Sequence, residues 1–164
     1  MEFFTRNYID TFGIDAVVLR FSAVIREWAG ADAGAIGTLL AAFVEPARRG
    51  ETAVIDNPAW TWRGLAEFID ARDSAEAAIA ALYAGRLPQH VYNINGAAAY
   101  EVSDFARIVG ETFPPAKVDI RAEAAAGLCG APVYRMRMDG AAAARDFGYR
   151  ARYDLAASLR HYAG

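Results

Sequence analysis

Apolar residues recur along this chain at two different spacings, and the spacing changes from one segment to the next. Phe4, Tyr8 and Phe12 are four residues apart, which predicts a helix over residues 2–12 with one apolar face. Residues 13–24 place apolar side chains on both faces of an extended chain, which is typical of an inner strand of a parallel sheet. The chain therefore opens with a helix and then a strand that needs neighbours.

The rest of the sequence continues this alternation of helix and strand spacings. That order indicates an α/β fold, and the length of 164 residues fits one domain over residues 1–164. The further elements are expected as a helix at 37–49, a strand and turn at 52–60, an extended stretch at 67–73, a helix starting at Asp73, a strand at 90–95, a helix capped by Ser103, a strand at 117–122, and two short helices capped by Asp139 and Asp154.

The helix starting at Asp73 carries the most detailed local signal. Asp73 and Glu76 have the spacing of a capping box, in which the first residue caps the helix and the second bonds back to it. The apolar residues Ile79, Leu82 and Tyr83 follow at helical spacing. We expect them to face the core.

Composition and charge narrow the class of protein. The chain is 55% hydrophobic and 23% charged, with a formal net charge of -3, so it has no basic surface of the kind that binds nucleic acid. No apolar run has the length of a membrane span, and charged residues spread through the first twenty positions argue against a signal peptide. The single cysteine, Cys129, excludes an internal disulfide. We expect a cytoplasmic protein without membrane or nucleic-acid partners.

The motifs that would identify chemistry are missing from the sequence. No strand is followed by Gly-x-Gly-x-x-Gly, no phosphate-binding P-loop is present, and the glycines between 30 and 37 fit neither spacing. His90 and His161 lack neighbours at metal-ligand spacing, and Cys129 has no base near it in the sequence. The residues alone therefore predict no metal site, no catalytic residue and no cofactor-binding residue.

Five segments nevertheless share a pattern, in order and spacing, with a known family. They include "GIDAVVLRFS", "EFIDARDSAEAAIAAL", "VYNING", "SDFARIVGETF" and the closing "MDGAAAARDFGYRARYDLAASLRHY". Together they resemble the C-terminal portion of an extended short-chain dehydrogenase/reductase, the NAD-dependent epimerase/dehydratase family. The resemblance covers nearly the whole chain.

This resemblance implies a particular architecture. In that family a glycine-rich dinucleotide loop opens the chain, and the catalytic Tyr-x-x-x-Lys pair would fall just before Met1. The strand at 16–21 and the strand at 90–95 would be the last two strands of a Rossmann-like parallel sheet, joined to the small substrate-binding lobe. The N-terminal cofactor half would be missing. NAD or NADP is expected for the full-length family member, and no cofactor in this chain.

The resemblance also indicates where a substrate would bind, with two departures. Ala23 stands where the family often has an asparagine that contacts the substrate, and Ala66 replaces an arginine that grips a nucleotide diphosphate. Arg26 and Arg63 are close to these positions in the sequence and could supply guanidinium groups to an anion. The alternative is that both are ordinary solvated arginines.

Two further residues are candidates for substrate binding. Ser22 would lie near the nicotinamide at the end of the first strand, or else be a buried hydroxyl without a role. Trp62 lies two residues after Trp60, and its ring could stack on a ring or base of the ligand. The alternative is that Trp62 packs inside the small lobe.

Two classes of function stay open. The first is the substrate-binding part of an NAD(P)-dependent sugar or sugar-nucleotide epimerase, dehydratase or reductase, inactive as a fragment. The second is a non-catalytic binding or assembly module derived from that family. The 16–21 strand lacks its expected partner, and Phe3 and Phe4 lie on the helix that in the resembled family belongs to the dimer interface. We therefore expect a sugar-like ligand, and either a homo-oligomer or pairing with the missing N-terminal half.

Overall fold

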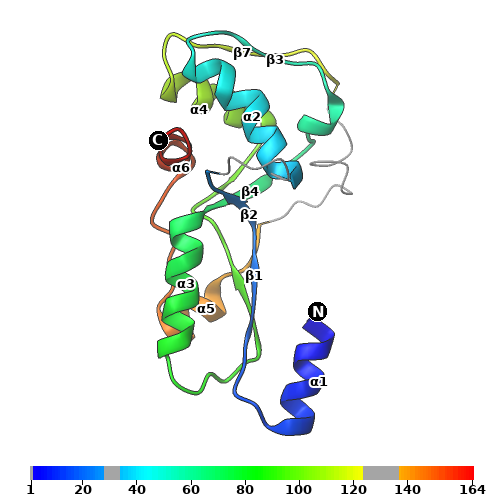
Figure 1. Cartoon of the computed structure of the whole chain (residues 1–164), viewed down its shortest axis with the longest axis vertical. Helices are drawn as coiled ribbons and strands as arrows, with labels where there is room; N and C mark the ends of the chain where they lie inside the picture. The colour runs from blue at the N-terminus through cyan, green and yellow to red at the C-terminus, as the bar shows by residue number, and fades with distance from the viewer. Residues whose placement is uncertain (1, 28–33, 124–136) are drawn as a thin grey trace.

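The computed structural model describes residues 2–27, 34–123 and 137–164, and Figure 1 shows helices and strands alternating along an elongated molecule. Within these ranges the helices are α1 (Glu2–Phe12), α2 (Gly34–Arg48), α3 (Ala71–Tyr83), α4 (Val102–Thr112), α5 (Ala141–Phe147) and α6 (Leu155–Tyr162), together with the 3-10 turn η1 (Pro58–Trp60). The strands are β1 (Val18–Phe21), β2 (Ala23–Ile25), β3 (Ala53–Ile55), β4 (Ala66–Asp70), β5 (Val91–Ile94), β6 (Ala99–Tyr100) and β7 (Val118–Ile120). Helices and strands alternate as the sequence predicts.

The described strands form three small sheets. β1 pairs with β5 in parallel, which is the arrangement expected for two strands of a Rossmann-like sheet. β2 pairs in parallel with β4, whose other edge takes β6 in antiparallel orientation, and β3 pairs in parallel with β7. The extended run predicted at 13–24 is interrupted at Ser22, so the chain passes there from the first sheet to the second.

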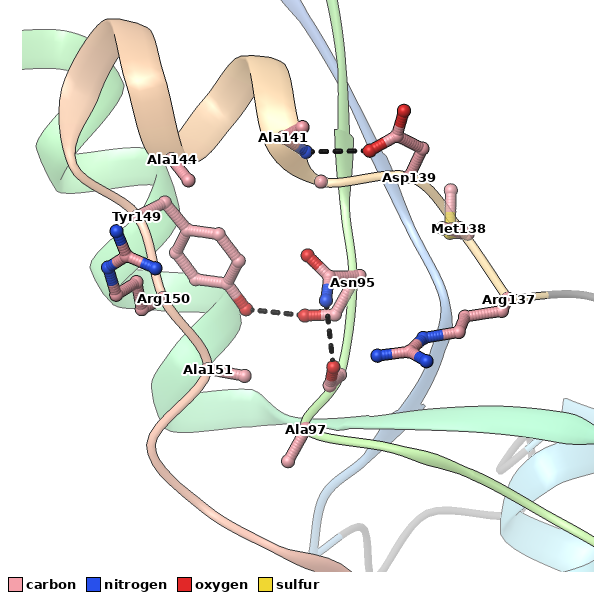
Figure 2. A pocket seen from close by; sticks show the side chains of 12 residues that line it. Asn95, Ala97, Arg137, Met138, Asp139, Ala141, Ala144, Tyr149, Arg150 and Ala151 are labelled. Atoms are coloured by element: carbon pink, nitrogen blue, oxygen red, sulfur yellow. Dashed lines mark hydrogen bonds between the residues drawn. The ribbon is translucent and has the colours of Figure 1, made fainter.

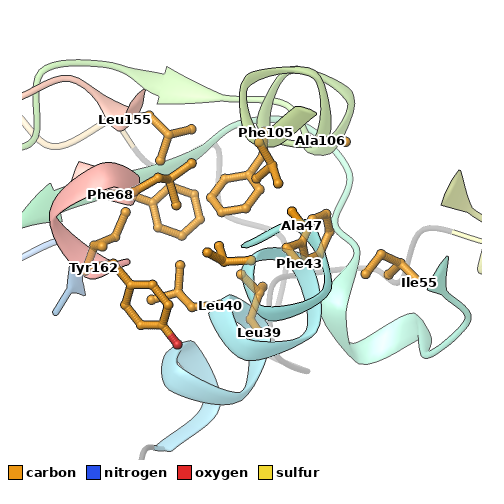
Figure 3. Close-up of a cluster of buried hydrophobic side chains, with 14 of the residues drawn as sticks. Leu39, Leu40, Phe43, Ala47, Ile55, Phe68, Phe105, Ala106, Leu155 and Tyr162 are labelled. Carbon is orange, nitrogen blue, oxygen red and sulfur yellow. The ribbon is translucent and has the colours of Figure 1, made fainter. Parts of the chain in front are cut away.

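Two clusters of buried apolar side chains hold these sheets to their helices. The larger joins α2, α4 and α6 to β2 and β4, and at its centre the Phe105 ring lies 5.2 Å from Phe43, 5.7 Å from Trp62 and 5.1 Å from Phe68, measured between ring centroids (Figure 3). The smaller packs α3 and α5 against β1 and β5, with Tyr92 fully buried. The first cluster defines what we call the small lobe.

Helix α1 lies apart from both clusters (Figure 1). Its only buried residue is Ile9, while Phe3, Phe4, Tyr8 and Phe12 are all more than half exposed. Glu2 accepts two hydrogen bonds from the Arg20 guanidinium, at 2.6 and 2.8 Å, and this pair links the start of α1 to β1. The predicted helix is confirmed, and its apolar face is open.

The start of α3 differs from the expectation. The cap is Asp70, whose carboxylate accepts the Arg72 backbone N–H at 2.8 Å, and not Asp73, which lies within the first turn. The reason is that β4 continues into α3 without a loop, so the helix begins earlier than the capping-box spacing suggests. The prediction that Asp73 caps this helix is therefore wrong.

The buried face of α3 also differs from the expectation. Ala77 and Ala81 face the core, whereas Ile79, Leu82 and Tyr83 are 55%, 76% and 82% exposed. Small side chains let the helix lie close to the sheet beneath it, and this packing turns the larger residues outward.

Three other helix starts correct the sequence prediction, and one confirms it. α4 begins after Glu101 without a side-chain cap, so Ser103 lies inside the helix, and α2 begins at Gly34 instead of 37. The Asp154 carboxylate accepts the Ala157 N–H at 2.8 Å and caps α6, as predicted. Asp139 accepts the Ala141 N–H at 2.9 Å, but the N-cap of α5 is Gly140, one residue later, so the prediction that Asp139 is the cap is wrong.

Within the described ranges no helix is both long and apolar enough to cross a membrane, and no group of potential metal ligands gathers. Cys129 and Gly30 lie outside the described residues.

Candidate functional site

The carboxyl ends of β1 and β5 meet at one edge of the molecule. Ligands of open α/β sheets bind at this kind of edge. Ser22 follows β1 there, and its backbone N–H donates to the Ile94 carbonyl at 3.3 Å. The Ser22 side chain is 9% exposed, and its Oγ has no hydrogen-bond partner among the described residues. A buried hydroxyl without a partner is costly, so Ser22 Oγ needs a partner from outside the described residues, a water or a ligand group; Thr112 Oγ1 on α4 has the same need.

A buried carboxylate ties three segments together at the same edge. Glu67, on β4, is 5% exposed and accepts the Gly96 N–H at 2.6 Å and the Met138 N–H at 2.7 Å. Burial raises the pKa of the Glu67 carboxyl, and the two N–H bonds and the Arg137 charge only partly oppose that shift. β2 and β4 are parallel, and Ala23 pairs with Phe68. The residues that precede these two, Ser22 and Glu67, therefore lie at the same level.

Two glycines let the backbones approach at this point. A Cβ at Gly96 would lie 1.8 Å from the Phe68 carbonyl oxygen, and one at Gly140 would lie 1.8 Å from Asn95 Oδ1. Both distances are far below van der Waals contact, so no other residue fits without movement of the backbone or of the Asn95 side chain. The edge is consequently closely packed.

A cavity of about 640 Å³ opens beside the end of β5, between it and α5 (Figure 2). Its charged lining groups are Arg137, Asp139 and Arg150, and the Asn95 amide also faces it. The Tyr149 hydroxyl donates to the Asn95 carbonyl at 2.7 Å, and burial raises the pKa of that hydroxyl, so it stays protonated. The remaining lining residues are Gly96, Ala97, Met138, Gly140, Ala141, Ala144 and Ala151.

The structure does not bring the two candidate arginines together. Arg26 follows the carboxyl end of β2, whereas Arg63 precedes the amino end of β4, and these two strands run parallel. The residues therefore lie toward opposite ends of the pair. Both are exposed, and neither lines the cavity.

Trp62 lies in the core of the small lobe. It is 3% exposed, its indole N–H donates to the Tyr100 carbonyl at 3.0 Å, and its ring packs against Phe68 and Phe105. The structure therefore shows lobe packing at Trp62, with no ring face left open for a ligand.

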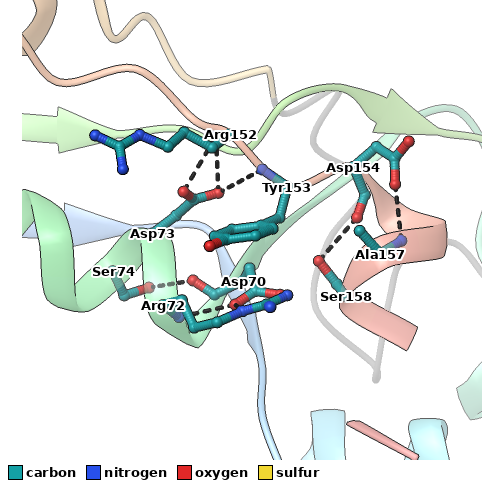
Figure 4. Close-up of polar contacts among 9 residues, drawn as sticks. All are labelled: Asp70, Arg72, Asp73, Ser74, Arg152, Tyr153, Asp154, Ala157 and Ser158. Carbon is teal, nitrogen blue, oxygen red and sulfur yellow. Dashed lines mark hydrogen bonds and ion pairs between the residues drawn. The ribbon is translucent and has the colours of Figure 1, made fainter. Parts of the chain in front are cut away.

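A polar clamp holds the segment that forms one wall of the cavity (Figure 4). The Asp73 carboxylate, 1% exposed, accepts the backbone N–H groups of Arg152 and Tyr153, each at 3.1 Å. The Arg72 guanidinium donates twice to Asp70 at 2.8 Å and lies 3.6 Å from the centroid of the Tyr153 ring. The clamp positions the chain just after Tyr149 and Arg150.

The two clamp carboxyls have opposite pKa shifts. For Asp70, burial by itself would raise the pKa, but the bonds from Arg72 and the contact with Ser158 outweigh it, and the pKa is lowered. For Asp73, burial dominates and raises the pKa, although two backbone N–H bonds oppose it.

The sequence prediction missed the four polar residues around the cavity. Asn95 lies in "VYNING", and Asp139 and Arg150 lie in the closing segment that begins at Met138, so these three are inside segments that carry the family resemblance, whereas Arg137 lies one residue before the closing segment. That position in the resemblance was the available signal, since nothing in their local spacing marks them as neighbours.

No protein-family model matches the chain, and no curated protein matches it. Solved structures do: a UDP-N-acetylglucosamine 4-epimerase from Bacillus cereus is similar at a TM-score of 0.78 with 18% identity, covering 98% of this chain and 51% of that one. An L-threonine dehydrogenase from Phytophthora infestans is similar at a TM-score of 0.76 with 19% identity. The match covers 98% of this chain and 51% of the dehydrogenase. A UDP-glucuronic acid 4-epimerase from Bacillus cereus, solved with UDP-glucuronic acid and NAD, is similar at a TM-score of 0.66 with 15% identity. The match covers 99% of this chain and 49% of that one.

These likenesses confirm the predicted fold. The chain has an α/β, Rossmann-like fold that is similar to about half of these epimerase and dehydrogenase structures. It spans about half the length of the solved structures that it matches.

Proposed function

We propose that this chain is the substrate-binding part of an NAD(P)-dependent epimerase, dehydratase or reductase acting on a sugar or sugar nucleotide, and that its ligand binds at the carboxyl end of β1. The observation that carries the proposal is the Ser22 hydroxyl, which is buried and without a hydrogen-bond partner among the described residues. The likeness to two nucleotide-sugar epimerases supports the choice of substrate.

Binding to the chain itself tests this site. Titration with UDP-glucose and with glucose 1-phosphate, followed by calorimetry, is expected to show saturable binding. Ser22→Ala should weaken it about five- to ten-fold, the usual loss for one hydrogen bond. Ser103→Ala, on the exposed side of α4, removes the same atom elsewhere and should change nothing. Equal binding by the wild type and Ser22→Ala would refute the role of Ser22.

The candidate arginines are tested by the same titration. Arg26→Ala and Arg63→Ala, separately and together, are expected to weaken binding of the two phosphate-containing ligands, because a guanidinium–phosphate pair is a strong charge-assisted contact. Arg26 and Arg63 lie toward opposite ends of the β2–β4 pair, so the losses should add for UDP-glucose, whereas glucose 1-phosphate, with a single phosphate, should respond to only one of the two substitutions. If the double variant binds the ligands like the wild type, Arg26 and Arg63 are ordinary surface residues without a role in binding.

We also propose that the residues of this chain bind no NAD(P) and catalyse no redox step by themselves. Dinucleotide affinity in such folds comes from a glycine-rich loop at a helix N-terminus, and the sequence contains no Gly-x-Gly-x-x-Gly. Its only lysine, Lys117, has no tyrosine four residues before it. Calorimetry with NAD and NADP should show no saturable heat at about millimolar ligand, and a micromolar dissociation constant would overturn this part.

Self-association is the expected assembly. Phe3, Phe4, Tyr8 and Phe12 form an exposed apolar face on α1, and β1 pairs only with β5 among the described strands. Burying this face and edge in a two-fold dimer would remove apolar surface and unpaired backbone groups from water. Sedimentation at tens of micromolar should show a dimer, and Phe4→Asp should dissociate it. A monomeric wild type would refute the proposal.

The second candidate is a non-catalytic binding or assembly module. Ala23 and Ala66 favour it, because these small side chains replace the ligand-contacting residues that the family often has there. DNA upstream of the codon for Met1 separates the two candidates. An in-frame Tyr-x-x-x-Lys with a glycine-rich loop further upstream supports the enzyme, and a nearby stop codon with normal expression of the short chain supports the module.

A further inference from the structure

The cavity beside β5 has a lining that neither the substrate site nor the clamp uses. Its volume of about 640 Å³ lies within the range of small-molecule sites. None of Ser22, Arg26 and Arg63 lines it, so it is distinct from the substrate site proposed above. The question is which chemistry its walls would recognise.

Two guanidinium groups face the cavity from different segments. Figure 2 shows Arg137 reaching in from one wall and Arg150 on the opposite wall beside Tyr149. Among the described residues, Arg150 has no ion-pair or hydrogen-bond partner, and Arg137 has only the through-space attraction of Glu67. Arg107 on α4, by contrast, is paired with both Asp104 and Glu111.

The nearby carboxylates are already engaged. Asp139 accepts the Ala141 N–H at 2.9 Å, and Glu67 lies behind the wall with both oxygens bonded to backbone N–H groups. Asp139 uses one oxygen in this bond and keeps its negative charge, so the charged groups that line the cavity are two guanidinium groups and one carboxylate, and the positive charge is in excess. The Asn95 amide lies between the two arginines and adds a neutral polar group.

The walls are fixed in place before any ligand binds. Asn95 is held against Gly140 with no room for a Cβ between them, its carbonyl accepts the Tyr149 hydroxyl, and the clamp at Asp73 holds the chain that follows Arg150. A preformed site loses less entropy when its ligand binds.

We propose that this cavity is a binding site for a small anion, a carboxylate or a phosphate, held between Arg137 and Arg150. A planar guanidinium fork matches both groups. The site needs no cofactor and no second chain.

Calorimetry on the 164-residue chain with sodium succinate and with inorganic phosphate, at constant ionic strength, tests the proposal. At least one of them should bind with one-to-one stoichiometry, and the comparison shows which group the cavity takes. Arg137→Ala and Arg150→Ala should each weaken binding about ten-fold, and Arg137→Lys should restore only part of it because the fork is lost. Arg107→Ala makes the same charge change on α4 and should leave the affinity unchanged.

Amide chemical shifts serve as a second readout should an arginine variant fold poorly. In the wild type, the ligand should shift the Asn95 side-chain amide and the Gly96 and Gly140 backbone amides. No saturable binding of either anion, shifts confined to other regions, or equal weakening by Arg107→Ala would each overturn the proposal. Any of these results would leave the substrate site at Ser22 untouched, since that site is tested with Ser22→Ala, at a residue that does not line the cavity.

Discussion

Removing the Asp73 carboxylate should strongly destabilise the chain, although Asp73 touches no ligand. The side chain is 1% exposed and receives the backbone N–H groups of Arg152 and Tyr153 at 3.1 Å. Asp73→Ala leaves both donors without a partner, at about 1–3 kcal/mol for each. Water reaches part of this region, because Arg152 itself is exposed, so we expect a total loss of about 2–4 kcal/mol.

Equilibrium unfolding in urea, followed by tryptophan fluorescence and circular dichroism, measures this loss. Glu76→Ala is the matched control, since it removes a carboxylate from the same helix that bonds Arg152 at 3.0 Å through an exposed ion pair. Exposed pairs contribute little, so the control should lose less than about 0.5 kcal/mol. Asp73→Asn should fall between the two, because one carbonyl oxygen remains to accept a bond.

The pH dependence gives a second check of the same reasoning. Burial raises the pKa of Asp73 in the fold above its ordinary value of 3.8, so the folded chain binds this proton more tightly than the unfolded chain. The stability advantage of wild type over Asp73→Ala should therefore be largest below that ordinary value and decrease as the pH rises through the folded pKa. The reasoning fails if Asp73→Ala is no less stable than Glu76→Ala, or if the advantage grows with pH.

Three further predictions concern stability. Gly96→Ala should cost about 1–3 kcal/mol in urea unfolding, because its Cβ would lie 1.8 Å from a backbone oxygen of β4, while Gly110→Ala meets only a 3.4 Å contact and should not destabilise the chain. The bonds from Arg72 lower the pKa of Asp70 in the folded chain. The wild type should therefore be more stable than Asp70→Asn above the ordinary pKa of an aspartate, and this stability difference should disappear as the pH falls through the lowered pKa of the folded chain. A constant stability difference across that pH range would contradict the prediction. Phe105→Ala should lose about 3–5 kcal/mol by thermal or urea unfolding, since the ring is fully buried among three other aromatic rings, and a loss below about 1 kcal/mol would show a core that refills easily.

Much of the local structure followed from the sequence because its signals act over a few residues. The spacing of Phe4, Tyr8 and Phe12 predicted α1. The doubly apolar run before Ser22 predicted an inner parallel strand; β1 is parallel to β5, but β5 is its one partner among the described strands and Phe21 is 39% exposed, so the inner position is not seen here. Asp154 was identified as a cap from its position alone.

The same local signals misplaced α3. Ile79, Leu82 and Tyr83 are its large apolar residues, yet the alanines face the sheet, because the distance between helix and sheet, and not hydrophobicity alone, selects the buried face. Asp73 matched a capping pattern, but the continuity of β4 into α3 gave the cap to Asp70.

The sequence by itself determined the alternation of helices and strands, the α/β class and the resemblance to part of a dehydrogenase fold, since periodicity and short motifs need no knowledge of distant neighbours. Only the tertiary structure decided the site. Glu67 bonds Met138 across 71 positions, and Asp73 bonds Arg152 across 79. The cavity likewise joins the end of β5 to the chain around α5. Contacts of that separation depend on how the sheets and helices pack, and no local pattern encodes them.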